Sequence, residues 1–482
     1  MLTQLSATEL RTKLDSREIS AVDVARAHLD RIAQLNESIF AYLHTDETSV
    51  LQFAEQAQKM IDDGKAGALT GIPVALKDNI QVTGLPTTCG SKILGDFVSP
   101  FDAGVTEKMK AEGMILLGKT NLDEFAMGTS TEHSAFGPTF NPWDLTRSPG
   151  GSSGGSAAAV CAEMATLSLG SDTGGSIRQP ASLCGIVGFK PTYGRCSRYG
   201  LVAFGSSLDQ IGPFARNVED AALLASVITG HDLKDATSIP MPSIDVSGLK
   251  TGSLKGKRFA VPNEVLGEGI DAELKSVFLQ ALKTLEAEGA SVEFIDLPSI
   301  KYGVTTYYLI APAEASSNLA RFDGVRYGLR EDGKGHIGMM ERTRAAGFGH
   351  EVKQRIMIGT YALSAGYYDA YYLKAQQVRA LMTREFNTAY ETYDSVLMPT
   401  SPIPAFKIGE LVNDPMALKQ LDYCTIPANM GGFPAISIPC GFASGLPVGL
   451  QIMNKALDDE AVFSIAFQAE RALNATKRPN LP

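Results

Sequence analysis

Three residues of the chain could take part in nucleophilic chemistry: Lys77, Ser152 and Ser176. Lys77 ends a short apolar run (IPVALK), and the two serines lie in the glycine-rich segments PGGSSGGS and GSDTGGSIR. A serine hydroxyl is a weak nucleophile until a base, such as a neutral amine, activates it. Taken singly, each residue also has an ordinary structural interpretation. Lys77 could be a solvated lysine, the segment around Ser152 a flexible linker and the segment around Ser176 a tight turn.

The residues that follow the first glycine-serine segment weaken its interpretation as a linker. Residues 157–162 (AAAVCA) have an apolar, helix-forming composition, whereas a flexible linker more often separates complete units. Glycine-rich turns that carry serines allow the backbone to come close to a ligand. The pattern therefore indicates a binding site at these turns. From the residue types alone, Ser153 competes with Ser152 for any role there.

Two short motif matches point to other chemistry but lack the context that each requires. Residues 113–120 (GMILLGKT) match the phosphate-binding loop, yet 114–117 is an apolar run that should itself be a strand. Residues 150–154 match the Gly-x-Ser-x-Gly nucleophile elbow, which follows a strand and needs a histidine partner. The preceding NPWDLTRSP ends in proline, and none of the six histidines lies in an evident motif. Neither a nucleotide site nor a Ser-His-Asp triad is predicted.

The composition excludes several classes of protein. The 482 residues are 44% hydrophobic with a net charge of −10, so the chain can bury a core but is poorly suited to bind nucleic acid by itself. No stretch approaches the roughly 18 apolar residues of a membrane helix, and the first residues lack a signal-peptide layout. The six cysteines are too sparse for a disulfide scaffold, and no Cys or His spacing predicts a metal site. We expect a cytoplasmic protein.

The elements that must position these residues are predicted to be those of an α/β protein forming one domain over 1–482. The N-terminal segment 1–65 has helical periodicity, with a capping box at Ser20 and Asp23. Residues 66–215 are rich in Gly, Ser and Thr and form the predicted catalytic core. Short apolar runs within this core predict short buried strands or turns between helices at 72–76, 114–117 and 186–189.

The second half of the chain, 257–482, is predicted to complete the sheet after a polar surface connection at 231–256. A strand at 258–262, a helix across 274–285 and a strand at 292–297 predict a βαβ unit with parallel pairing. The last predicted elements are strands at 435–439 and 448–453 and a closing helix at 462–473.

The segment 150–176, which continues into IRQP, resembles the signature of the amidase signature family, and its spacing to Lys77 is also similar. The resemblance covers most of the chain. It implies a large mixed β-sheet flanked by helices on both faces, with substrate-binding helices in the second half of the chain. It also implies a Ser-cisSer-Lys triad of Ser176, Ser152 and Lys77.

In that triad Ser176 would attack the carboxamide carbon of glutamine, and Ser152, after a cis peptide bond, would relay the proton to Lys77. Lys77 must then be neutral, so its pKa must fall from about 10.4 to about 7–8, and burial shifts it in this direction. Because Asp78 would oppose that shift, we expect its carboxylate to point away. The oxyanion would be bound by backbone N–H groups of Thr173, Gly174, Gly175 and Ser176.

The resemblance also implies which residues hold the substrate. Arg355 would bind the carboxylate of glutamine and Asp422 its ammonium group, with Tyr307 and Thr129 nearby. The alternatives are a surface ion pair for Arg355 and a helix or turn cap for Asp422.

Three further segments, 118–132, 314–328 and 351–372, resemble the family members that supply ammonia within tRNA-dependent amidotransferases. This resemblance implies a carbon-nitrogen ligase in which the present chain holds no cofactor. A B subunit would bind tRNA, ATP and magnesium, and a small C subunit would complete the heterotrimer. The product would be Gln-tRNA(Gln) or Asn-tRNA(Asn). The alternative is a free-standing amidase of the same family that acts on small amides.

Overall fold

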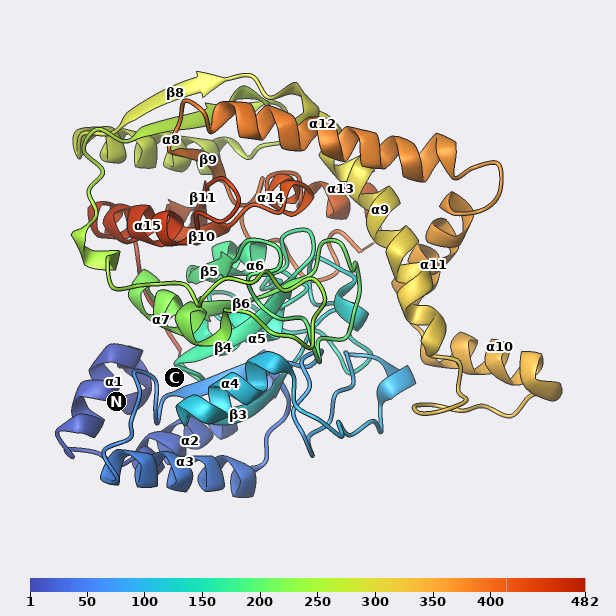
Figure 1. Cartoon of the computed structure of the whole chain (residues 1–482), viewed down its shortest axis with the longest axis horizontal. Helices are drawn as coiled ribbons and strands as arrows, with labels where there is room; N and C mark the ends of the chain where they lie inside the picture. Colours follow the sequence, from blue (N-terminus) through green and yellow to red (C-terminus); the bar gives the residue numbers. More distant parts are fainter. Residues whose placement is uncertain (413, 482) are drawn as a thin grey trace.

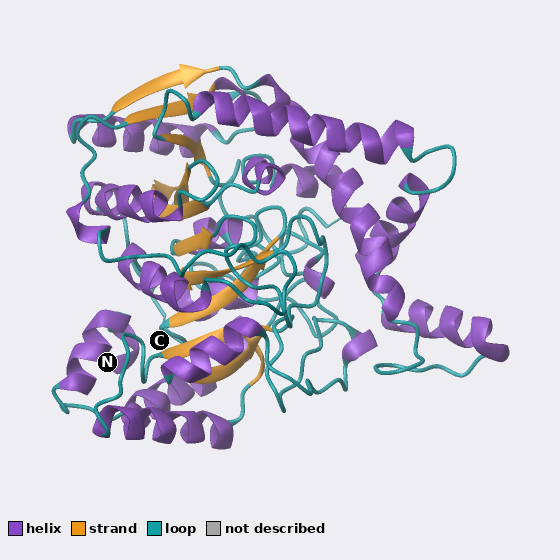
Figure 2. Cartoon of the chain, viewed as in Figure 1, coloured by secondary structure: helices purple, strands orange, loops and turns teal. Residues whose placement is uncertain are grey.

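A large β-sheet forms the centre of the computed structural model, which describes residues 1–412 and 414–481. The strands in this part of the chain are β1 (Tyr42–His44), β2 (Pro73–Lys77), β3 (Ile115–Thr120), β4 (Leu167–Asp172), β5 (Val187–Lys190), β6 (Gln210–Ala215), β7 (Arg258–Pro262), β8 (Ser291–Ile295), β9 (Ser395–Pro399), β10 (Ala435–Ala443) and β11 (Leu446–Met453). All belong to one sheet, whose strands are drawn in orange in Figure 2. Their order in the sheet is β1-β3-β2-β4-β6-β5-β10-β11-β9-β7-β8. Its pairings are both parallel and antiparallel, as predicted for a mixed sheet.

Helices surround this sheet (Figure 1). They are α1 (Ala7–Asp15), α2 (Ala21–Ile39), α3 (Glu47–Asp62), α4 (Gly104–Glu112), α5 (Gly154–Cys161), α6 (Arg178–Cys184), α7 (Val218–Ile228), α8 (Ala272–Ala287), α9 (Gly303–Asn318), α10 (Gly335–Gly347), α11 (His350–Ala362), α12 (Lys374–Ala389), α13 (Pro415–Gln420), α14 (Ile426–Gly431) and α15 (Asp459–Leu473). Among the described residues, none of these helices has the length and apolar character needed to cross a membrane.

Strand β5 shows that helices cover both faces of the sheet. Phe189 packs on Phe463 of α15, with ring centroids 4.2 Å apart. At the preceding residue, Gly188, a Cβ atom would lie only 2.6 Å from the Ala181 Cβ atom of α6. Since successive strand residues point to opposite faces, α15 and α6 lie on opposite sides of the sheet. This arrangement confirms the predicted fold class.

The N-terminal segment is helical as predicted, apart from one short strand. The capping box is present, because Ser20 Oγ accepts a hydrogen bond from the Asp23 N–H at 3.1 Å and the Asp23 carboxylate accepts one from the Ser20 N–H. The exception is β1, which pairs antiparallel with β3 at the end of the sheet. A strand of three residues is too short for alternation to reveal it in the sequence.

The predicted βαβ unit is confirmed, since β7 and β8 pair in parallel with Arg258 opposite Ser291 and are linked by α8. The polar connection at 231–256 contains only one short helical turn, Leu249–Thr251. Residues 303–389, which we call the helical arm, hold α9 to α12 and extend away from the sheet on the side opposite α1 (Figure 1). Within the arm α9 and α11 pack tightly, since a Cβ at Gly359 would lie 1.9 Å from the Pro312 carbonyl oxygen.

Candidate active site

Parallel strands bring Lys77 close to the loop that contains Ser176. Lys77 is the last residue of the fully buried β2, and β4, which ends at Asp172, runs parallel beside it. The carboxyl ends of parallel neighbours meet at one edge of a sheet, where ligand sites of α/β proteins commonly form. Ser152 reaches the same edge from the loop that precedes α5, a helix packed on β2 and β4.

The Lys77 amine is hydrogen-bonded to two serine hydroxyls. Its Nζ lies 2.8 Å from Ser152 Oγ and 2.9 Å from Ser171 Oγ, and Lys77 and Ser152 are both fully buried. Burial lowers the pKa of Lys77 to about 7, although three more distant carboxylates oppose the shift. An amine with a pKa near neutrality can lose its proton at physiological pH and act as a base.

Asp78 points away from this amine, as expected. Its Oδ1 atom lies 2.9 Å from Lys119 Nζ, and its Oδ2 atom accepts a hydrogen bond from the Thr88 hydroxyl at 2.5 Å. Lys119 is the lysine that a phosphate-binding loop would use. In the structure it lies on β3 in a buried ion pair, so most of the motif match, residues 115–120, is a strand and not a phosphate cradle.

The two adjacent serines make different contacts. The peptide bond between Gly151 and Ser152 is cis, and a Cβ at Gly151 would lie 2.3 Å from the Asp123 carboxylate, which leaves room only for glycine. Ser152 contacts the Lys77 amine, whereas the Ser153 hydroxyl donates to the Ser171 carbonyl oxygen at 3.2 Å. The geometry therefore favours Ser152 over Ser153 for proton transfer to the lysine.

Ser176 lies in the loop between β4 and α6. It is 6% exposed, whereas Lys77 and Ser152 are 0% exposed, so Ser176 is the triad residue most accessible to a substrate. Its carbonyl oxygen accepts a hydrogen bond from the Ser153 N–H at 3.3 Å, which joins the two serine loops. Nucleophile, relay and base candidates thus share one edge of the sheet.

The backbone N–H groups of residues 173–176 are available to bind an anion. Within the part of the chain that the structure describes, none of them donates a hydrogen bond to another protein group. A Cβ at Gly174 would lie 2.8 Å from the Tyr307 ring, and one at Gly175, whose φ is +146°, would lie 2.2 Å from the Thr425 hydroxyl. Glycine at both positions leaves these amides unobstructed, which is what an oxyanion site requires.

A buried ion pair that the sequence analysis missed fixes both ends of this loop. Asp172 ends β4, Arg178 begins α6, and two guanidinium nitrogens lie 3.0 and 3.1 Å from the two carboxylate oxygens. Arg178 also donates to the Thr425 carbonyl oxygen at 2.8 Å and to Asn429 Oδ1 at 2.6 Å. The only sequence signal was the position of both charges at the borders of the glycine turn.

Ser171 was also missed, although it is the second partner of the Lys77 amine. Its Oγ atom accepts a hydrogen bond from Asn79 Nδ2 at 2.9 Å, in addition to the one from Lys77. All three residues are buried. This network holds the amine in a single position next to Ser152, and Ser171 lies within the same glycine-rich segment that revealed Ser176.

Three of the four predicted substrate residues lie together beside the catalytic loop. Tyr307 (α9) packs against Gly174, and Arg355 (α11) lies close enough to Tyr307 and Asp422 to influence both pKa values. Asp422 is buried, its Oδ1 atom has no hydrogen-bond partner among the described residues, and burial raises its pKa well above the usual range. No side chain caps the following helix α14, so the structure does not support the capping alternative. An unpartnered buried carboxylate oxygen is suited to an ammonium ligand.

Arg355 does form an ion pair, but a buried one. Its Nε atom lies 2.7 Å from Glu351, one turn earlier on α11, and its guanidinium lies 5.0 Å from the Tyr308 ring centroid. The pKa of Arg355 is raised by Tyr308 and Glu351 despite burial, so the side chain stays charged. The Arg355 guanidinium can therefore also form an ion pair with the carboxylate of a ligand.

Thr129, the fourth predicted residue, is connected to the site through Gln179. Gln179 Nε2 donates to the Thr129 carbonyl oxygen at 3.1 Å, and Gln179 Oε1 accepts from the Gly151 N–H at 3.0 Å. The Thr129 hydroxyl donates to the Leu418 carbonyl oxygen at 3.3 Å. Thr129 thus borders the serine loop, while its hydroxyl is directed towards another segment.

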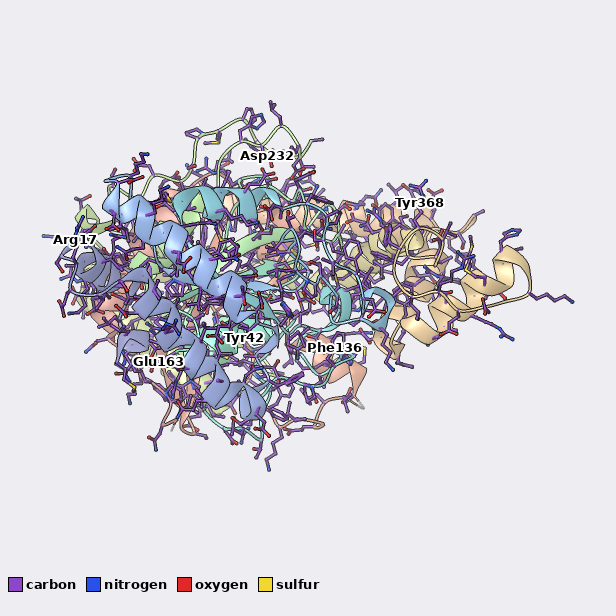
Figure 3. The ribbon with its side chains drawn as sticks, turned by 90° about the horizontal axis from the view of Figure 1, so that it is seen from below. Arg17, Tyr42, Phe136, Glu163, Asp232 and Tyr368 are labelled. Carbon is purple, nitrogen blue, oxygen red and sulfur yellow. The ribbon has the colours of Figure 1, made fainter. Side chains whose placement is uncertain are left out.

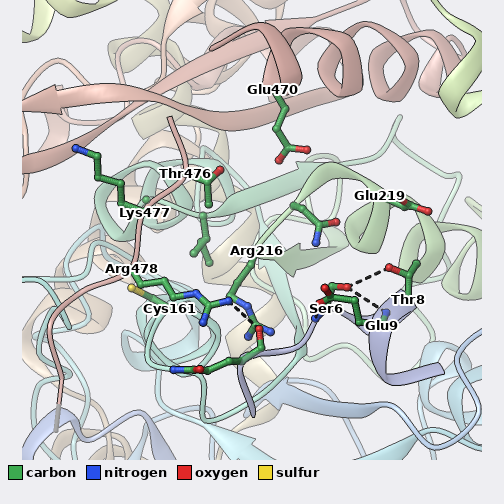
Figure 4. Close-up of a pocket in the computed structure, with 14 residues that line it drawn as sticks. Ser6, Thr8, Glu9, Cys161, Arg216, Glu219, Glu470, Thr476, Lys477 and Arg478 are labelled. Atoms are coloured by element: carbon green, nitrogen blue, oxygen red, sulfur yellow. Dashed lines mark hydrogen bonds between the residues drawn. The ribbon is translucent and has the colours of Figure 1, made fainter. Parts of the chain in front are cut away.

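A surface cavity of about 450 Å³ lies elsewhere, where the N-terminal residues meet the C-terminal tail (Figure 4). Arg216, Glu470 and Arg478 line it, together with Cys161 at the end of α5 farther from Ser152. None of the predicted site residues lines this cavity.

Known proteins are similar to this chain over most or all of its length. The family described as Amidase matches residues 23–463. The A subunit of glutamyl-tRNA(Gln) amidotransferase from Desulforamulus reducens is 53% identical over 483 residues, covering 100% of both chains. The crystal structure of the corresponding A subunit from Thermotoga maritima has a TM-score of 0.81 at 45% identity, covering 100% of this chain and 99% of that one. The peptide amidase of Stenotrophomonas maltophilia has a TM-score of 0.85 at 27% identity, covering 99% and 98%. The chain therefore belongs to the amidase family.

Proposed function

We propose that this chain is the glutamine-hydrolysing A subunit of a tRNA-dependent amidotransferase. The observation that carries the proposal is 53% identity, over the full length of both chains, to a relative named as the A subunit of glutamyl-tRNA(Gln) amidotransferase. The hydrogen bond between Lys77 and Ser152, next to a loop with free backbone amides, supports amide hydrolysis as the reaction. The enzyme is then the glutaminase component of a carbon-nitrogen ligase.

The reaction begins when Ser176 Oγ attacks the carboxamide carbon of glutamine. Its proton passes to Ser152, whose own proton passes to the Lys77 amine, and the oxyanion is bound by the amides of residues 173–176. Collapse of this tetrahedral species breaks the C–N bond, and the proton returns through Ser152 to the leaving ammonia. Water, deprotonated by the same relay, then hydrolyses the glutamyl ester on Ser176. Each oxyanion donor contributes about 10²–10³ to the rate of such reactions.

Glutamine is held by groups of opposite charge. Its carboxylate pairs with Arg355, and its ammonium group pairs with Asp422, whose Oδ1 atom lacks a hydrogen-bond partner among the described residues. Tyr307 and Thr129 border the same space. Binding an ammonium ion favours the charged form of Asp422, which burial alone disfavours.

The ammonia is used by partner subunits. A B subunit holds ATP, magnesium and Glu-tRNA(Gln), or Asp-tRNA(Asn), and a small C subunit joins the two in a cytoplasmic heterotrimer. The chain's net charge of −10 supports this division, because a protein that grips tRNA alone would carry excess cations. A free-standing amidase is less well supported, since the peptide amidase shares the fold at only 27% identity.

The test measures ammonia release from glutamine by the chain alone, and then with its cognate B and C subunits, ATP and misacylated tRNA. We expect slow hydrolysis alone and a large increase in the assembled complex. Fast hydrolysis of varied amides that is indifferent to partners would show a free-standing amidase instead. ATP binding to the isolated chain would contradict the assignment of ATP to the B subunit.

A further inference from the structure

Two residues of the proposed glutamine site, Tyr307 and Arg355, belong to the helical arm and not to the core. The arm reaches as far as Tyr368, which lies at the opposite end of the molecule from Arg17 (Figure 3). Contacts at the base of the arm must therefore fix these two residues relative to the catalytic loop. Several of these contacts meet at residues 204–209 (FGSSLD), which directly precede β6 and which we call the junction turn.

The junction turn is hydrogen-bonded to two helices of the arm. On α9, Glu314 Oε2 accepts a hydrogen bond from the Ser207 N–H at 2.9 Å. The last residue of the same helix, Asn318, donates to the Phe204 carbonyl oxygen at 3.0 Å. On α12, Arg379 donates to the Ser207 hydroxyl at 2.8 Å and to the Ser207 carbonyl oxygen at 3.0 Å. The position of the turn and the position of the arm are thus coupled.

Phe204 reaches from the junction turn to the arginine that is assigned to the substrate carboxylate. Its ring is buried, and the ring centroid lies 5.6 Å from the Arg355 guanidinium carbon. The Tyr308 ring lies 5.0 Å from the same carbon. Aromatic rings at such distances attract a guanidinium group and favour one position for it. A displaced Phe204 would therefore leave Arg355 less well positioned.

Asp209 connects the junction turn to the oxyanion loop. Thr173 directly follows β4, and Asp209 directly precedes β6, the antiparallel neighbour of β4. The Asp209 carboxylate accepts a hydrogen bond from the Thr173 hydroxyl at 2.7 Å. It also accepts hydrogen bonds from the N–H groups of Phe204 and Gly205, at 2.9 and 3.0 Å. One carboxylate therefore holds both the first residue of the oxyanion loop and the residue that packs on Arg355.

The environment of Asp209 suits a fixed acceptor. The residue is 3% exposed, and burial raises the pKa of its carboxyl group to about 6, which still leaves it ionised at neutral pH. An ionised carboxylate has only acceptor atoms, so it can bind all three donors at once. Because the Thr173 hydroxyl is attached directly to Cβ, holding it restricts the backbone of Thr173, whose N–H is the first of the oxyanion donors.

We propose that Asp209 is a positioning residue for glutamine hydrolysis, which keeps the Thr173 N–H in the oxyanion site and Phe204 beside Arg355. The inference rests on the proposed function, because the oxyanion and the substrate carboxylate belong to glutamine hydrolysis. Asp209 acts on the reaction only through its neighbours. Its loss should impair both the chemical step and glutamine binding, whereas loss of the Thr173 hydroxyl should impair mainly the chemical step.

The test measures kcat and KM of ammonia release from glutamine by the full chain in complex with its cognate B and C subunits. In Asp209→Asn one acceptor oxygen must replace two. This variant should lower kcat by about 10- to 100-fold, less than the 10²–10³ for complete removal of an oxyanion donor. It should also raise KM at least about threefold.

A second variant, Thr173→Val, removes only the hydroxyl and keeps the shape of the side chain. It should lower kcat by about 10- to 100-fold while KM stays within about twofold of wild type. The conservative Thr173→Ser keeps the hydroxyl and should have a kcat at least about fivefold higher than that of Thr173→Val. If Asp209→Asn does not fold, as judged by circular dichroism, the two Thr173 variants decide the question.

The matched control is Asp459→Asn. Asp459 is also fully buried, and its carboxylate accepts hydrogen bonds from the N–H and the hydroxyl of Thr192 at 2.8 and 2.6 Å. This variant should keep kcat and KM within about twofold of wild type. An equal loss of kcat in Asp459→Asn and Asp209→Asn would overturn the inference, because any buried carboxylate would then have the same effect.

Wild-type kcat in both Asp209→Asn and Thr173→Val would also overturn the positioning role, while the proposed function would stand. If the wild-type complex hydrolysed no glutamine, the proposed function would fail, and the inference with it.

Discussion

At the carboxyl edge of β2 and β4, Lys77, Ser152 and Arg178 are fully buried, and each is hydrogen-bonded to other protein groups. On the outer face of the helical arm the reverse holds, because Tyr361 and Tyr367 are exposed and their rings pack against one another. The first arrangement fixes reacting groups before substrate arrives, as catalysis requires. The second leaves aromatic and apolar side chains exposed to solvent. The difference teaches that the groups assigned to the reaction are enclosed and fixed by the core, whereas the outer face of the arm is held by few contacts with the rest of the chain.

The largest effect is expected when the proposed nucleophile, Ser176, is replaced. Ser176→Ala should abolish glutamine-dependent activity, with a loss of about 10⁴-fold or more. Ammonia-dependent amidation by the assembled complex should remain, because added ammonia replaces the product of glutamine hydrolysis. The measurement is amidation of misacylated tRNA with glutamine or with ammonium chloride as nitrogen donor. Residual glutamine-dependent activity above a hundredth of wild type would remove Ser176 from its assigned role.

Lys77 offers the next largest effect. Burial lowers its pKa to about 7, and the neutral amine is the base. The kcat/KM of glutamine hydrolysis should therefore fall about tenfold per pH unit below that pKa and level off above it. Lys77→Arg should lose about 10³-fold, because arginine stays protonated at every accessible pH.

The control for Lys77 is Lys119→Arg, another buried lysine, which is paired with Asp78 and not with a serine. It should retain the wild-type pH profile. A flat profile for the wild type between pH 5.5 and pH 8.5, about 1.5 units on either side of that pKa, would rule out a titrating base.

Arg178 tests whether the buried network also maintains the fold. Arg178→Met leaves Asp172 buried without its partner, which should lower the free energy of unfolding by about 3–5 kcal/mol. The matched control is Arg258→Met, which breaks an exposed ion pair with Glu293 and should cost less than about 1 kcal/mol. Urea denaturation followed by circular dichroism measures both. Equal losses in the two variants would show that the buried pair has no special structural role.

The substitution of Asp422 has the smallest expected effect and tests how the ammonium group of the substrate is bound. Asp422→Asn removes the partner of the substrate ammonium, so KM for glutamine should rise by about 10- to 100-fold while kcat changes little. The KM for an amide substrate that lacks an amino group should not change. Steady-state kinetics with both substrates makes the comparison. An equal rise in KM for glutamine and for the amide without an amino group would show that Asp422 does not bind the ammonium group.

Much of this architecture was predictable from the sequence, because local patterns specify it. The strand that ends at Lys77, the glycine turn around Ser176 and the βαβ unit with β7 and β8 all follow from apolar runs and turn residues. The ion pair of Asp172 with Arg178 depends on where β4 and α6 meet in space, which no local pattern records.

Other features could not be predicted from the sequence, for different reasons. Ser171 shares its residue type with many serines nearby, and β1 is too short for alternation to appear. The exposure of the arm tyrosines could not be predicted either, because tyrosine occurs both in protein cores and on surfaces. Side-chain environment, more than backbone structure, is what the sequence could not supply.

Mass spectrometry of the chain quenched during glutamine turnover tests the central claim most directly. The account predicts a mass increase of one glutamyl group on Ser176, which disappears in Ser176→Ala. It also predicts that the ester builds up only at pH values where Lys77 is neutral. An adduct on Ser152, Ser153 or a cysteine, or turnover with no covalent species and an unchanged rate in Ser176→Ala, would contradict it.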